Sequence, residues 1–317
     1  MNGNGGTDVP QWKDATQWAA IAGHWTFDGA GGVFSANGSH DERSGNPFGI
    51  ALSSHRVRDG AILLDVRLSD RLEMAGGVVL GFESIHSPYT IITLGGWDRA
   101  YSIGQFLPEV GWRSVELAGM ANNLDAASTY HLAVRIAGQR VEFSVDDVLV
   151  LQTTLPSPIV HAGFGLYAYG PGNVTYRNVR VKRDRLRAFV IMPFKEPFDS
   201  LYRDVIKPVA DAADDVEVLR ADDIKGPGLI LDDIRRQIDE SHLVVAEISE
   251  WNPNVFYELG HAHAIGKPTI LLVRDDYLPK LPFDVRGYRA IVYKDSIAGK
   301  KDVESELRQH LRAISRA

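Results

Sequence analysis

The chain has 317 residues, of which 44% are hydrophobic, and this is enough for two domains with packed cores. It has no cysteine, which excludes disulfides, thiolate metal ligands and a cysteine nucleophile, and its net charge of -7 with scattered Lys and Arg residues argues against a nucleic-acid partner. The first residues lack the pattern of a signal peptide, and no apolar run nears the ~20 residues that span a bilayer, so we expect a cytoplasmic protein without a membrane partner.

Residues 12–182 have the pattern of an all-β domain. Short apolar stretches recur between Gly, Asn, Asp and Pro residues, and apolar and polar positions alternate clearly in residues 130–136 and 141–145. Many short strands at nearly regular spacing predict a β-sandwich. The expected strands are residues 61–68, 77–82, 90–94, 101–105, 131–136, 140–145, 148–153, 163–169 and 174–181.

From residue 186 to residue 317, expected strands alternate with segments of helical length. The run Ala188-Phe-Val-Ile-Met192 is continuously apolar, which is typical of a strand covered on both faces. The alternation predicts a second domain of the α/β class, with a doubly wound sheet of parallel strands. The five expected strands are residues 188–192, 216–219, 243–248, 269–273 and 289–293, and the expected helices are residues 198–213, 229–240, 253–265 and 303–314.

The most specific segment of the chain is residues 251–268, which predict a short helix between two apolar strands. Asn252 suits the cap, Pro253 suits the first helical position, and Gly266 is expected to end the helix. Helical spacing places the apolar side chains on one face and the polar ones on another, which we expect to look towards a ligand. The apolar set is Val255, Leu259 and Ala262, and the polar set is Asn254, Glu258 and His261.

Polar residues also follow the first three expected strands of this domain. They are Pro193, Phe194 and Lys195, then Arg220 and Asp222, then Glu247 and Glu250. Because the carboxyl ends of parallel strands meet at one edge of a sheet, these residues are expected to converge. Acids hold ribose hydroxyls and attack or stabilise an anomeric carbon, whereas Lys195 and Arg220 are candidates for a phosphate contact.

On these motifs, residues 187–295 resemble the nucleoside 2-deoxyribosyltransferase-like superfamily, which is related in fold to TIR domains. The matching pieces are Phe189-Val-Ile-Met-Pro-Phe194, Arg220-Ala-Asp-Asp-Ile224, Asp232-Asp-Ile-Arg-Arg-Gln-Ile238, Asn252-Pro-Asn-Val-Phe-Tyr-Glu-Leu-Gly260 and Gly266-Lys-Pro268. The resemblance implies a flavodoxin-like fold, cleavage of an N-glycosidic bond in a nucleoside, a nucleotide or NAD, and Glu258 as the nucleophile. It also implies a role in anti-phage defence, a homo-oligomer, and no cofactor or metal.

The remaining roles in this site follow from position and side-chain chemistry. Glu247 and Glu250 are candidates for the acid/base, with Asp222 for the ribose hydroxyls, and Asn252, Asn254 and His261 for further substrate contacts. His261 and His263 do not share a helix face, so no paired metal site is predicted.

The sequence also departs from the resembled pattern. The approach to Glu258 is the bulky Asn254-Val-Phe-Tyr257, Ser241-His242 stands where an Ala-Asp pair is usual, and Trp251 lies seven residues before Glu258 where TIR enzymes have four. A second interpretation therefore stays open, in which this domain binds a nucleotide signal without turning it over.

The first domain resembles the concanavalin A-like, laminin-G-like jelly roll. The motifs are Trp25-Thr-Phe27, Gly76-Gly-Val-Val-Leu-Gly-Phe82, Tyr130-His-Leu-Ala-Val-Arg135 and Gly163-Phe-Gly-Leu-Tyr-Ala-Tyr169. The resemblance implies a module that binds a carbohydrate or a protein, with Tyr89, Trp97, Tyr101 and Trp112 as candidate contacts, although core packing also accounts for aromatic residues. No tight acidic motif of a hydrolase is present, so the domain is interpreted as a sensor or interaction module rather than an enzyme.

Overall fold

A computed structural model gives the structure of the protein. It describes residues 13–14, 17–28, 31–36, 47–69, 73–126, 128–159, 161, 163–213, 216–223, 230–285, 287–288 and 290–316. Trp12, Ile224, Leu229 and Arg289, which belong to the elements and motifs expected above, lie outside these residues. The chain forms two compact units, a β-sandwich unit and an α/β unit. The sandwich unit comprises Met1–Arg135, Glu142–Thr153 and His161–Asp184, and the α/β unit comprises Ile136–Val141, Thr154–Val160 and Arg185–Ala317.

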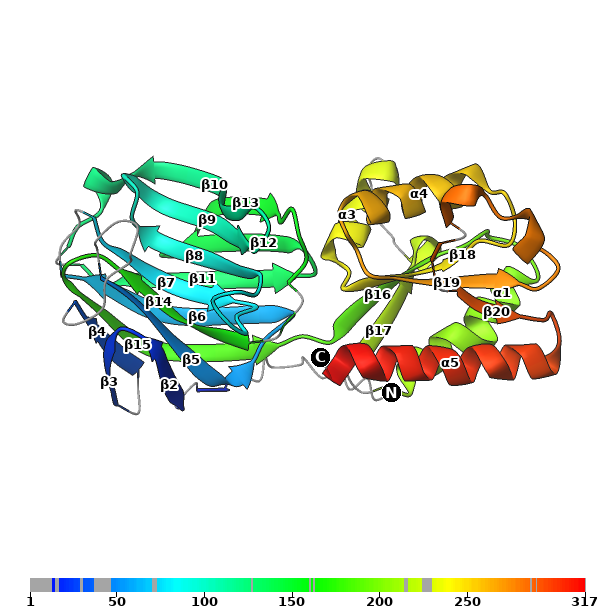
Figure 1. The fold of residues 1–317 in the computed structure, drawn as a ribbon, viewed down its shortest axis with the longest axis horizontal. Helices are drawn as coiled ribbons and strands as arrows, with labels where there is room; N and C mark the ends of the chain where they lie inside the picture. The colour runs from blue at the N-terminus through cyan, green and yellow to red at the C-terminus, as the bar shows by residue number, and fades with distance from the viewer. Residues whose placement is uncertain are drawn as a thin grey trace, which may run out of the picture. The chain divides into compact units, whose positions relative to one another are not determined.

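The sandwich consists of two antiparallel sheets (Figure 1). Within the described residues the first sheet has the order β13-β12-β11-β6-β15-β4-β3, with β1 also paired to β15, and the second has the order β10-β9-β8-β7-β14-β5-β2. The strands of the first sheet are β1 Lys13–Asp14, β3 His24–Asp28, β4 Gly31–Ser35, β6 Gly60–Leu68, β11 Tyr130–Ala137, β12 Arg140–Val145, β13 Val148–Thr154 and β15 Asn173–Arg183. Those of the second are β2 Trp18–Ala22, β5 Phe48–Arg56, β7 Ala75–Leu80, β8 Tyr89–Gly95, β9 Arg99–Leu107, β10 Gly111–Met120 and β14 Gly163–Tyr169.

The register of the second sheet decides which of its side chains face the first sheet. Opposite Gly76 the ladder pairs Leu94 on one side and Ala168 on the other. A Cβ on Gly76 would lie 2.7 Å from Val174 Cγ1 and 2.9 Å from Val66 Cγ1 of the first sheet. The Gly76 row therefore faces the core between the sheets, and the alternate row faces away from the first sheet.

The α/β unit contains a five-stranded parallel sheet in the order β17-β16-β18-β19-β20, which confirms the predicted fold class. Its strands are β16 Leu186–Ile191, β17 Val216–Arg220, β18 Leu243–Glu247, β19 Thr269–Arg274 and β20 Ala290–Tyr293. The chain runs from β16 outwards to β17 and then returns to the other side of β16. The strand order thus reverses between β16 and β18, where open α/β sheets bind their ligands.

Helices cover both faces of this sheet (Figure 1). They are α1 Phe198–Leu201, α2 Lys207–Asp211 and α5 Ile297–Arg316 on one face, and α3 Ile230–Glu240 and α4 Pro253–Ala264 on the other. In β16, an interior strand of the sheet, Ala188 and Val190 enter the first of these cores, and Phe189 and Ile191 enter the second. Both rows are buried, which explains why the strand reads as one continuous apolar run.

The elements differ from the expected ones in three respects. The expected helix 198–213 contains a π-helical turn, Tyr202–Ile206, between α1 and α2. Helix α5 begins six residues earlier than expected, at Ile297. Strands β1 to β5 and β10 were not expected, and in β10 the mostly exposed side chains explain this, since no apolar alternation marks it. None of the helices in the described ranges has the length and apolar character needed to cross a bilayer.

Candidate functional site

Helix α4 follows the end of β18, at the edge of the sheet where the parallel strands end, which we call the carboxyl edge, and it carries Glu258 in its second turn. The Asn252 side chain caps the helix by accepting hydrogen bonds from the backbone N–H of Asn254 at 3.0 Å and of Val255 at 3.5 Å. Pro253 occupies the first turn, and Gly266, with φ +68°, follows its end. The Asn252 side chain therefore stabilises the start of α4, and its oxygen is already hydrogen-bonded.

Glu258 is half-buried and unpaired. Burial raises its pKa to about 7, and no other cause contributes to the shift. Among the described residues, none forms a hydrogen bond or an ion pair with its carboxylate. A carboxyl group in this state is close to half-ionised at neutral pH, which suits a group that acts as a nucleophile or exchanges a proton.

Glu247 lies at the end of β18, but it is only 1% exposed and cannot reach a ligand at the surface. Its carboxylate accepts hydrogen bonds from the Ser249 hydroxyl, from the Ser249 N–H at 3.3 Å and from the Tyr293 hydroxyl at 3.2 Å. The Ser249 hydroxyl in turn accepts one from the N–H of Arg274 at 2.7 Å. Glu247 thus ties together the ends of β18, β19 and β20, and burial raises its pKa to about 7.

Lys195 and Glu250 bridge the point where the strand order reverses. Lys195 follows β16, Glu250 follows β18, and the Lys195 Nζ lies 2.6 Å from the Glu250 Oε2. Lys195 is more than half exposed and Glu250 is partly buried. Because an exposed ion pair of this kind is weak, a ligand can displace it and take up either charge.

Arg220, at the end of β17, is buried and forms hydrogen bonds to two acidic side chains. Its Nε and Nη2 donate to Asp222, the Nε at 2.7 Å, and its Nη1 donates to Asp199 at 2.8 Å. The same bond from Arg220 holds the pKa of Asp222 below its usual range. All three guanidinium nitrogens are therefore occupied, which leaves Arg220 poorly placed for the phosphate contact suggested by the sequence.

Aromatic rings enclose the Arg220 guanidinium on two sides. Its central carbon lies 4.4 Å from the Tyr202 ring centroid and 5.1 Å from that of Phe194. The Tyr202 hydroxyl donates to Asp223 at 2.6 Å, and burial is the largest cause that raises its pKa. Phe194 is 58% exposed, so the outer face of its ring remains open above a fixed cation. This arrangement suits a planar group such as a nucleobase.

The other predicted contacts lie apart from these groups. His261 Nε2 lies 3.1 Å from Asp239 Oδ1 near the end of α3, and His261 stands one helical turn beyond Glu258, away from the carboxyl edge. Asn254 is exposed in the first turn of α4, whereas Pro193, which follows β16, is buried and does not present a surface to a ligand. Lys195, Glu250 and Phe194 thus follow strand ends at the carboxyl edge, Glu247 is buried at the end of β18, and Glu258 lies in the second turn of α4.

The sandwich carries a second candidate surface, the row of the second sheet that faces away from the first sheet. Trp97 stacks on Trp112 at 5.9 Å and on Tyr169 at 5.7 Å between ring centroids, and Tyr89 stacks on Phe106 at 5.0 Å. We call these five residues the aromatic face. Trp97 has φ +52° and is 44% exposed, so its backbone is held in an unfavourable region while its ring stays accessible.

A glycine gives the Trp112 ring its position on this face. A Cβ on Gly104 would lie 2.1 Å from Trp112 Cζ2, so the indole lies flat across this position. Tyr101 does not belong to the face, because it pairs with Leu94 of the inner row and contacts Phe143 of the first sheet at 6.2 Å. The sequence did not single out Tyr169 or Phe106, although the alternation of residues 163–169 was visible, because the shared face depends on register.

No family model and no curated protein matches the chain. Similar solved structures cover the sandwich part of it. The carbohydrate-binding module CBM66 from Bacillus subtilis is 17% identical with a TM-score of 0.43, covering 53% of this chain and 97% of that one. The laminarinase catalytic domain from Thermotoga maritima MSB8 is 12% identical with a TM-score of 0.40, covering 55% and 96%. A protein of galectin-like fold from Bacillus subtilis is 12% identical with a TM-score of 0.40, covering 54% and 94%.

Proposed function

We propose that the α/β unit cleaves the N-glycosidic bond of a nucleoside-type substrate, a class that includes nucleosides, nucleotides and NAD. The observation that carries this proposal is the state of Glu258, a half-buried carboxyl group with a pKa of about 7 and no partner among the described residues. It stands on a capped helix beside the carboxyl edge of a parallel sheet. The resemblance of residues 252–260 to the transferase motif supports the same role.

The reaction that follows from this placement has two steps. The ionised Glu258 carboxylate attacks the anomeric carbon, a C–O bond forms, and the glycosidic C–N bond breaks with its electron pair going to the leaving nitrogen. Water then attacks the same carbon, releases the carboxylate and gives its proton to solvent. A pyridinium base such as the nicotinamide of NAD departs as a neutral molecule, so its departure requires no acid.

Neighbouring groups support binding. The exposed ring of Phe194 offers a stacking surface, and it is fixed by Arg220 beneath it. Lys195 and Glu250, once separated by a ligand, supply one cation and one carboxylate for a phosphate and for ribose hydroxyls. Glu247 acts through the strand ends that it joins, as a positioning residue, because its side chain is buried.

The test measures, by liquid chromatography, the free base released from NAD and from a panel of nucleosides and nucleotides. Wild type is compared with Glu258→Gln and with Glu306→Gln, a matched change at an exposed position on α5. We expect wild type and Glu306→Gln to release base from at least one substrate and Glu258→Gln to release none above background. Equal turnover by Glu258→Gln would remove Glu258 from the chemistry.

One observation favours a second candidate, a nucleotide sensor without turnover. The charges near the carboxyl edge are paired in the absence of a ligand: Lys195 with Glu250, and Arg220 with Asp199 and Asp222. A ligand that breaks one of these pairs would change the local structure, which suits a sensor. A sensor predicts saturable nucleotide binding by wild type, with no base released from any substrate. Binding by equilibrium dialysis, measured on the same samples as the release assay, separates the two candidates.

The aromatic face favours a ligand-binding role for the sandwich. Stacked, partly exposed tryptophan rings such as Trp97 and Trp112 are suited to the apolar face of a sugar ring. We infer that this face binds a carbohydrate. Trp97→Ala is expected to abolish retention on an immobilised polysaccharide panel, whereas Leu149→Ala, at an exposed position near the start of β13, leaves it unchanged.

A further inference from the structure

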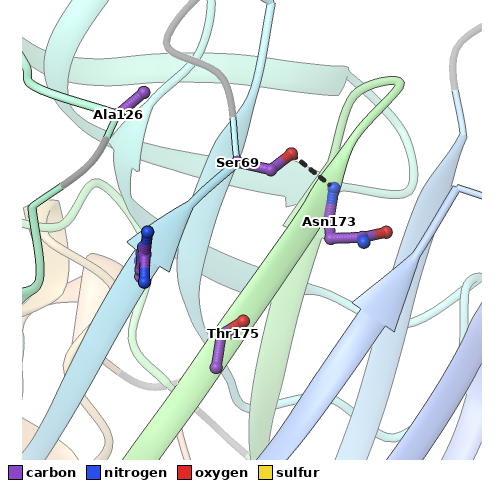
Figure 2. Close-up of a pocket in the computed structure, with 5 residues that line it drawn as sticks. Ser69, Ala126, Asn173 and Thr175 are labelled. Carbon is purple, nitrogen blue, oxygen red and sulfur yellow. Dashed lines mark hydrogen bonds between the residues drawn. The ribbon is translucent and has the colours of Figure 1, made fainter.

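A second opening in the sandwich lies on the other sheet, on the outward side of β6 and β15. The register pairs Thr175 directly with Arg67, so these two side chains share a face, and Ser69 and Asn173 follow two positions further on the same face. Together with Ala126, they line a cavity of about 470 Å³, which we call the β6–β15 pocket (Figure 2). Four of its five lining residues are polar, and none belongs to the aromatic face.

The rim of the pocket is held together by paired hydrogen bonds. The N–H of Ser69 donates to the carbonyl of Asn173 at 2.9 Å, and the N–H of Asn173 donates back to the Ser69 hydroxyl oxygen at 2.8 Å (Figure 2). These bonds use the backbone of Asn173 and leave its side-chain amide unengaged among the described residues. The amide of Asn173 and the hydroxyl of Thr175 are therefore available to a ligand on a fixed frame.

Arg67 supplies a positive charge that no described residue pairs with. It is exposed, and no hydrogen bond or ion pair joins it to any residue in the described part of the chain. Asp65, two positions earlier on the same face of β6, is already engaged by His131 Nδ1 at 2.7 Å and by the Asn178 amide at 2.6 Å. Asp125, beside Ala126, accepts from the Ser128 hydroxyl at 2.9 Å.

These features select an anion that also carries hydroxyl groups. A guanidinium presents parallel N–H donors that match the oxygens of a carboxylate or a phosphate. The amide of Asn173 and the hydroxyl of Thr175 match sugar hydroxyls, which both donate and accept. The volume lies within the range of about 300–1,000 Å³ that is typical of small-molecule sites. We propose that the β6–β15 pocket binds an acidic saccharide, with its carboxylate or phosphate on Arg67.

The test uses saturation-transfer NMR titrations of the full chain with glucuronate, glucose 6-phosphate, glucose and inorganic phosphate. We expect one or both of the acidic sugars to bind saturably and glucose to bind at least roughly 10-fold more weakly, because it lacks the charged bond to Arg67. The two acidic sugars tell whether the carboxylate or the phosphate is preferred. Inorganic phosphate reports the charge contact alone.

Variants then assign the site. Arg67→Gln is expected to weaken acidic-sugar binding roughly 10- to 100-fold, the range for one lost charged contact, whereas Arg113→Gln, at an exposed position on β10, leaves it unchanged. Asn173→Ala is expected to weaken the sugars but not inorganic phosphate. Titration of Trp97→Ala beside wild type reports any binding at the aromatic face, and the binding that Arg67→Gln removes belongs to the β6–β15 pocket. Thermal melting of each variant reports its folding.

Three results would overturn the proposal. They are no saturable binding of either acidic sugar, binding that Arg67→Gln leaves unchanged, and glucose binding as tightly as glucuronate and glucose 6-phosphate. The outcome is independent of base release by the α/β unit, because the pocket and Glu258 are assayed with different ligands.

Discussion

The two units differ in how they treat their charged side chains. At the carboxyl edge of the α/β unit, charges are paired with one another: Lys195 with Glu250, and Arg220 with Asp199 and Asp222. Glu258 has no partner within the described residues. In the sandwich, Asp65 and Asp125 near the β6–β15 pocket are engaged, whereas Arg67 has no partner in the part of the chain that the structure describes. We therefore propose that a charge left unpaired among the described residues, rather than the density of charges, marks the candidate ligand site of each unit.

The largest effect is expected at Glu258. Glu258→Gln keeps the size of the side chain but removes the nucleophile, so kcat is expected to fall at least about 10³-fold with little change in KM. Initial rates on the substrate found in the panel measure both constants. If Glu258→Gln raised KM and left kcat unchanged, the carboxylate would be a binding group. Its lack of a partner would then not distinguish its role from that of the paired charges.

The pH dependence of the same reaction sharpens this contrast. The nucleophile must be ionised, and the pKa of Glu258 is raised to about 7, so the rate is expected to rise with pH and level off above about pH 8. Below the pKa, kcat/KM should fall about tenfold per pH unit. A rate profile from pH 5 to 9 checks this. A profile that is flat down to pH 5 would place the essential ionisation elsewhere.

Glu247 should control stability rather than chemistry. Its pKa is about 7 in the folded chain and near 4.5 in the unfolded chain, so the folded state binds the proton more tightly. Stability is therefore expected to fall as the pH rises from about 4.5 to 7 and to level off above it, by about 3 kcal/mol in total. Urea unfolding of wild type and Glu247→Gln at pH 5 and 8 measures this loss.

The glutamine variant defines the outcome for Glu247. Glu247→Gln has no charge to bury, so its loss of stability between pH 5 and 8 should be smaller than that of wild type by about the same 3 kcal/mol. Base release should be retained in part, in contrast with Glu258→Gln. Equal pH dependence in the two proteins would show that Glu247 does not titrate in this range.

A smaller loss is expected from the paired charge at the end of β17. Arg220→Met removes the cation that binds both Asp199 and Asp222. It also removes the cation–π contact with the Phe194 ring. We expect the free energy of unfolding to fall by about 2 kcal/mol, less than for a fully buried pair because both acids are partly exposed. Chemical denaturation measures it, and a change within about 0.5 kcal/mol would contradict a structural role.

The smallest effect is expected for the exposed ion pair. Lys195→Met should change the free energy of unfolding by less than about 1 kcal/mol, because surface ion pairs contribute little. It should instead raise KM for phosphate-bearing substrates more than for nucleosides, which steady-state kinetics on matched pairs of substrates reports. Identical KM changes for both substrate types would mean that Lys195 does not face the phosphate.

Local signals were enough to predict much of the α/β unit. The apolar run of β16, the Asn252 cap and the Gly266 stop all act over a few residues, so the strand and the helix could be placed from the sequence. Local signals could not predict which side chains remain free to contact a ligand. Arg220 meets Asp199, a partner 21 residues earlier on α1, and that contact appears only when the strand and the helix are packed together.

The sandwich shows the same division. The alternation in β11 and β12 predicted strands, and these strands are present. Which aromatic residues share a face depends on register between strands, so Tyr101 was grouped with Tyr89 and Trp112 although it lies in the opposite row. The β6–β15 pocket was not predicted either, since Arg67 and Thr175 are more than a hundred positions apart in the chain and meet only across the ladder.

The π-helical turn between α1 and α2 has a consequence for how this site arose. Such a turn holds one more residue than an α-helical turn and leaves the helix before and after it intact. Leu201 before the turn and Val209 after it are both in the core, while Tyr202 contacts Arg220 and Asp223. A single inserted residue is the smallest change that produces such a turn. One insertion or deletion is therefore enough for a helix of this kind to gain or lose the contact between the Tyr202 ring and Arg220.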